Sequence, residues 1–71
     1  MTQVWDLALT EDMARQVRAW RVDDDFTWRG VASLADETWG TTTDGNQLFG
    51  MDLCVASARM LNEDPESEPW N

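Results

Sequence analysis

The chain is 71 residues long, has a formal net charge of −9 at pH 7, and contains five tryptophans, one cysteine and no histidine. Its length allows a single domain, and its negative charge disfavours membrane surfaces and nucleic-acid backbones as partners because like charges repel. The lack of histidine and lysine removes the usual catalytic pairs and the usual metal ligands, so we predict no enzyme, metal or cofactor.

The first predicted element is a helix that begins after Thr10 and ends near the run Asp23–Asp25. Thr10 is a good N-cap, and the two acidic residues that follow it complement the dipole of the first turn. Three successive aspartates favour a turn over a helix interior. The apolar residues that recur at helical spacing are Met13, Val17 and Trp20.

The second predicted helix begins after Thr27 and ends at Gly40. Phe26 and Val31 flank its start at the spacing of a hydrophobic staple, and a glycine is the most common residue just past a helix end. The apolar stripe of this helix is about 100° wide, as expected for a surface helix. It consists of Trp28, Val31, Ala32, Ala35 and Trp39.

A third helix is expected from about Gln47 to Leu61, with either Asp44 or Asn46 as its N-cap. Its apolar residues fall into two groups on the helical wheel. The wide face holds Leu48, Met51, Cys54, Val55, Ala58 and Leu61. The second face holds Phe49, Leu53, Ala56 and Met60, separated from the first by Asp52, Arg59, Gly50 and Ser57. A helix that is apolar on two sides is buried between neighbours or lies at an interface, which leaves a homodimer open.

These elements predict an all-α fold, a compact three-helix domain over residues 10–61 that is helix-turn-helix-like. A short N-terminal arm (1–9) precedes it, and an acidic C-terminal tail (62–71) follows. Cys54 lies among apolar residues, which predicts a buried thiol and fits a reducing cytoplasm. Trp5 and Trp70 lie in the flanking segments, where they either pack on the core or anchor a partner.

The segment from Arg15 to Leu61 resembles the helix-turn-helix domains of serine resolvases and recombinases. The runs that carry the resemblance are VRAWRVDDDFTWRGVASLADETWG and GNQLFGMDLCVASARML. The residues that correspond to the second helix of that family are Thr27, Val31, Ala32 and Leu34. The resemblance implies that the third helix is a recognition helix, yet acidic residues dominate from Asp36 onward, with Arg59 as the one base. The fold analogy can therefore hold without the DNA-binding role.

The predicted function is that of a protein–protein interaction module whose partner has a basic surface, such as that of a DNA-binding protein. The candidate partner-binding residues are Trp70, Glu63, Asp64, Glu66, Glu68, Phe49, Leu53 and Met60. The alternative is a nucleic-acid-binding regulator that acts as a dimer. Its candidate phosphate and base contacts are Arg15, Arg18, Arg21, Arg29, Asn46 and Gln47. The same arginines could instead pair with Glu11, with Asp23–Asp25 or with the acidic tail.

Overall fold

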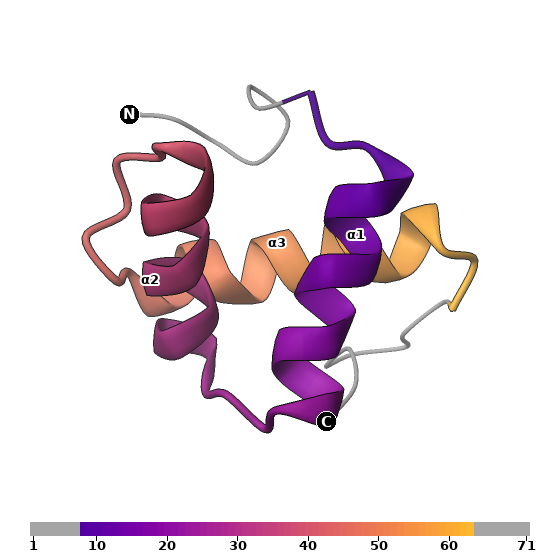
Figure 1. Cartoon of the computed structure of the whole chain (residues 1–71), viewed down its shortest axis with the longest axis horizontal. Coiled ribbons are helices and arrows are strands. Elements are labelled where there is room, and N and C mark those ends of the chain that lie inside the picture. Colours follow the sequence, from indigo (N-terminus) through magenta and orange to yellow (C-terminus); the bar gives the residue numbers. More distant parts are fainter. Residues whose placement is uncertain (1–7, 64–71) are drawn as a thin grey trace.

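The computed structural model describes residues 8–63, which fold into three α-helices and one π-helical turn (Figure 1). Helix α1 spans Glu11–Arg18 and continues into the π-helical turn η2, Ala19–Asp23. Helix α2 spans Trp28–Trp39, and α3 spans Gln47–Met60. The first two helices lie side by side and run in opposite directions, while α3 crosses behind both (Figure 1). The predicted all-α, three-helix fold is confirmed.

Each helix begins at a side chain that accepts backbone N–H groups of the first turn. Thr10 Oγ1 accepts from the N–H of Met13 (3.2 Å), and Thr27 Oγ1 accepts from that of Gly30 (3.1 Å). For α3 the cap is Asn46 rather than Asp44, because the Asn46 Oδ1 atom accepts from Leu48 at 2.8 Å and from Phe49 at 3.4 Å. These bonds satisfy N–H groups that have no partner inside the helix.

Helix α1 ends through a widened turn that the apolar spacing did not predict. The N–H of Asp24 donates to the carbonyl of Ala19, five residues earlier, at 3.0 Å, and that of Phe26 donates to Trp20 at 3.0 Å. Asp25 takes a left-handed conformation with φ of 57°. Aspartate enters this region more readily than most residues with a Cβ, so the acidic run ends the helix as expected.

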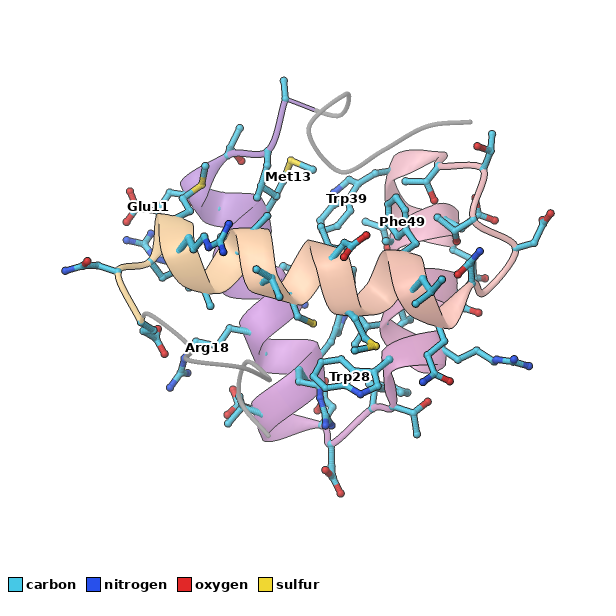
Figure 2. All side chains as sticks on the ribbon, turned by 180° about the vertical axis from the view of Figure 1, so that it is seen from behind. Glu11, Met13, Arg18, Trp28, Trp39 and Phe49 are labelled. Carbon is cyan, nitrogen blue, oxygen red and sulfur yellow. The ribbon has the colours of Figure 1, made fainter. Side chains whose placement is uncertain are left out.

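All three helices contribute side chains to one core. Its buried members are Val17, Trp20, Val31, Ala32, Ala35, Phe49, Leu53 and Cys54. The rings of Trp20 and Trp39 pack with their centroids 5.2 Å apart and their planes tilted by 46°. In the view from behind, Trp39 and Phe49 lie along one edge of α3 and Trp28 lies along the other (Figure 2). The tryptophans of the helices therefore surround α3 instead of forming a separate binding platform.

The predicted division of α3 into two apolar faces was wrong. Its buried residues are Phe49, Gly50, Leu53, Cys54, Ser57 and Ala58. These form a single face of two adjacent rows at i, i+4 spacing, as a helix that packs across two neighbours requires. Gly50 and Ser57, expected to separate the faces, therefore lie in the core. Leu48, assigned to the wide apolar face, is 69% exposed.

Helices α2 and α3 approach each other closely at Gly50. A Cβ atom at this position would lie 1.9 Å from the carbonyl oxygen of Trp28 and 2.7 Å from its carbonyl carbon. No side chain fits at that distance from a backbone. Gly50 thus sets how near the two helices approach.

Candidate functional site

Two arginines of α1 form ion pairs inside the domain. Arg15 pairs with Glu11 and, at 3.6 Å, with Asp12. Arg18 Nε donates to Glu63 Oε1 at 2.9 Å, which joins α1 to the residues that follow α3. These pairs are partly exposed and contribute little to stability. Their main consequence is electrostatic, because each bound carboxylate offsets an arginine that was a candidate phosphate ligand.

Arg21 is held against the turn between η2 and α2. The carbon at the centre of its guanidinium group lies 4.1 Å from the centroid of the Trp28 ring, which is a cation–π contact. Its Nη1 atom donates to the carbonyl of Phe26 at 2.9 Å. The Arg21 side chain therefore fastens the turn to α2.

The other candidate nucleic-acid contacts lie at the start of α2 and at the start of α3, which are adjacent. Arg29 is exposed on α2, and none of the ion pairs among residues 8–63 involves it. Asn46 is engaged as the cap of α3, whereas Gln47 is exposed at the first position of that helix. The structure therefore brings Arg29 near Asn46 and Gln47, since a Cβ at Gly45 would lie 3.5 Å from the Arg29 Cγ atom. Arg18 lies at the other end of α3, where it pairs with Glu63.

The connection between α2 and α3 is held by buried threonines. Thr43 Oγ1 donates to the carbonyl of Ala32 at 3.1 Å, and Thr41 Oγ1 donates to Asp36 Oδ1 at 3.2 Å. The connection occupies residues 40–46, so it is longer than the turn of about three to four residues in helix-turn-helix motifs. It is nevertheless an ordered part of the domain.

Most exposed acidic side chains have no ion-pair partner within residues 8–63. The acidic residues of this kind are Asp23, Asp24, Asp25, Glu37, Asp44 and Asp52. Three of them follow one another where η2 ends and the turn to α2 begins, and we call Asp23–Asp25 the acidic turn. Among the exposed charges without an ion-pair partner in residues 8–63, these six acidic side chains outnumber the two arginines, Arg29 and Arg59.

Of the four predicted partner-binding residues within residues 8–63, two are in the core, and the other two, Met60 and Glu63, line one surface depression. Phe49 is 8% exposed and Leu53 is 0% exposed, so both belong to the core and are not offered to a partner. Met60 is 44% exposed near the end of α3. Glu63 is bonded to Arg18. The remaining candidates, Asp64, Glu66, Glu68 and Trp70, lie outside the described residues, as does Trp5.

Sequence reasoning missed the outward side of α3. Leu48 is the most exposed large apolar residue between residues 8 and 63, and Val55 is half-buried on the same side of the helix. A shallow depression of about 230 Å³ is lined by Asp52, Val55, Ala56 and Arg59. The helical wheel grouped Leu48 and Val55 with the buried Cys54. The outward side of α3 was therefore not recognised from the sequence.

The Cys54 thiol is fully buried in the core. Burial raises its pKa from the ordinary value of 9.0 to about 12, and the positive charge of Arg21 opposes part of that shift. A thiol that stays protonated is a poor nucleophile and a poor metal ligand. Cys54 therefore acts as a small apolar side chain.

We predict that the free energy of unfolding falls as the pH rises from about 9 to about 12. Above the ordinary pKa of a thiol, the unfolded chain loses the Cys54 proton while the folded chain keeps it, so the unfolded state is favoured. The chain has no tyrosine or lysine to titrate in this window. Urea unfolding at about pH 8 and about pH 10.5 should show the loss for the wild type and a much smaller one for Cys54→Ala. Equal losses in both proteins would contradict this assignment.

No protein-family model matches the chain, and neither a curated protein nor a solved structure shows significant similarity to it. The resemblance to resolvase helix-turn-helix domains therefore stays a prediction. Within residues 8–63, no three cysteine or acidic side chains are grouped so as to hold a metal ion. No helix of that part of the chain has the length and apolar character needed to cross a bilayer.

Proposed function

We propose that the domain is a non-enzymatic protein–protein interaction module whose partner presents a basic surface. The observation that carries this proposal is the distribution of charge. Arg15 and Arg18 are paired within the domain and Arg21 is held over Trp28, whereas the acidic turn is exposed without ion-pair partners among the described residues. A basic surface is the chemical complement of such a turn.

The acidic turn is well suited to present its charge. It lies at the C-terminal end of α1 and η2, where the helix dipole is negative and adds to the potential of the carboxylates. Arg21 fixes the backbone of the turn through its hydrogen bond to Phe26. A backbone that is already ordered loses less conformational entropy when a partner binds.

A DNA-binding protein is the partner class that this chemistry fits best. Such a protein carries lysine and arginine side chains arranged for phosphates, and closely spaced carboxylates offer them comparable negative charge. In this proposal the domain would occupy the nucleic-acid site of its partner. The competing role, a nucleic-acid-binding regulator, is supported by no arrangement of basic residues in residues 8–63.

The proposal is tested by capturing a partner from lysate of the source cells on the immobilised full chain, then purifying that partner. We expect a protein of net positive charge whose dissociation constant rises at least about tenfold when the acidic turn is neutralised by Asp23→Asn, Asp24→Asn and Asp25→Asn together. Asparagine keeps the turn, because it also tolerates left-handed backbone conformations.

The matched control removes charge elsewhere, by Glu37→Gln together with Asp44→Asn, and should leave the dissociation constant within about twofold. Circular dichroism of each variant confirms that the helices are kept. The proposal is wrong if no basic protein is captured at physiological salt, or if neutralising the acidic turn leaves the affinity unchanged.

A further inference from the structure

The outward side of α3 carries one acidic and one basic residue in a symmetric arrangement. Asp52 and Arg59 are seven positions apart, two turns of helix, so they lie on the same side and about 10 Å apart along the axis. Val55 and Ala56 lie midway between them. All four residues line the shallow depression of about 230 Å³.

Neither charge is satisfied within the described part of the chain. Asp52 and Arg59 are both exposed, and the ion pairs among residues 8–63 include neither of them. Apolar surface surrounds them. Leu48 is 69% exposed one turn before Asp52, and Met60 is 44% exposed beside Arg59.

This pattern is self-complementary under a two-fold rotation. The two-fold axis is perpendicular to α3 and level with the midpoint between Val55 and Ala56. It places a second α3 against the first, running in the opposite direction. The rotation places Asp52 against Arg59 of the second copy, and Arg59 against Asp52 of the second copy. It also places Val55 level with Ala56 of the second copy. Such a contact is isologous, the arrangement of most soluble homodimers.

We propose that the outward side of α3 is a homodimer interface in which two antiparallel copies of the helix meet at Val55 and Ala56. The occupant is a second copy because the charge pattern matches itself, and because the small Ala56 side chain lets a second helix approach closely. The contact is limited to one face of a 14-residue helix. It is therefore smaller than a standard interface of about 800 Å² per partner, and self-association should be weak, in the micromolar to millimolar range.

The test uses single charge reversals of the full chain, measured by sedimentation velocity over a range of concentrations at physiological salt, which screens the repulsion between two chains of net charge −9. The wild type should shift toward the dimer mass as its concentration rises. Asp52→Arg and Arg59→Asp each place like charges opposite one another, so each variant alone should associate at least about tenfold more weakly. The two variants mixed in equal amounts should associate again, because every contact across the mixed dimer then joins opposite charges.

Glu37→Arg is the control for Asp52→Arg, since it makes the same change of charge at an exposed position of α2 and should leave self-association in place. Recovery in the mixture cannot result from misfolding of either variant, so a failure to fold would not imitate the expected result. A wild type that stays monomeric up to about 1 mM, or a dimer that both reversals leave intact, would overturn the proposal. Both outcomes are independent of whether the acidic turn binds a basic partner.

Discussion

Replacing Gly50 with alanine should unfold the domain. The added Cβ would lie 1.9 Å from the carbonyl oxygen of Trp28 and 3.3 Å from its Cα, so the neighbouring atoms are backbone of α2 and cannot rotate away. Alanine is favoured over glycine inside a helix by about 1 kcal/mol, but relieving this clash must separate α2 from α3. We expect a loss above about 4 kcal/mol, which is comparable with the whole stability of a domain this small.

The control for this prediction is Gly30→Ala in α2. A Cβ there meets the Cδ1 atom of Phe26 at 3.2 Å and Thr27 Oγ1 at 3.4 Å, and the Phe26 ring is exposed enough to move. The free energy of unfolding should change by no more than about 1 kcal/mol. Far-ultraviolet circular dichroism and urea unfolding measure both variants. A Gly50→Ala protein that unfolds cooperatively at the wild-type midpoint would show that α2 and α3 do not cross at this residue.

The second large effect is expected from Leu53→Ala. Leu53 has no exposed surface and lies in the core with Val17 and Val31, so truncating it leaves a cavity. Buried leucine-to-alanine substitutions cost about 2–5 kcal/mol. In a 71-residue chain, a loss of that size should leave much of the protein unfolded at 25 °C.

Leu48→Ala is the matched control for Leu53→Ala, because it makes the same chemical change on the same helix. Leu48 is 69% exposed, and we expect a change within about 0.5 kcal/mol. Chemical unfolding of dilute samples, in which self-association is negligible, gives both values. Equal costs at the two positions would contradict the orientation assigned to α3.

The helix boundaries could be predicted from the sequence because their signals are local. Thr10, Thr27 and Asn46 accept hydrogen bonds from residues two or three positions away, and Gly40 ends α2 with φ of 70°. The side of α3 that packs could not be predicted, because it depends on where α1 and α2 cross that helix. Gly50 reads as a gap in an apolar pattern until the backbone of Trp28 is placed against it.

In the candidate site, too, local contacts could be predicted from the sequence, whereas long-range contacts could not. Ion pairing of the α1 arginines was one of two open alternatives, and the pair between Arg15 and Glu11 follows from helical spacing alone. The pair between Arg18 and Glu63 joins residues 45 positions apart. The contact of Arg21 with Trp28 depends on the π-helical turn, which the apolar spacing does not reveal. These long-range contacts decide whether Arg18 and Arg21 are engaged within the domain or free.

We propose that the ion pairs of Arg15 and Arg18, together with the excess of acidic residues, leave the protein with little affinity for nucleic acid. A gel shift of duplex DNA at about 50 mM salt tests this most directly, because electrostatic contacts are strongest at low salt. We predict no retarded band up to about 100 μM protein, a range that covers ordinary non-specific binding. A band that weakens as salt is added, and that disappears with Arg15→Ala and Arg18→Ala, would contradict the account.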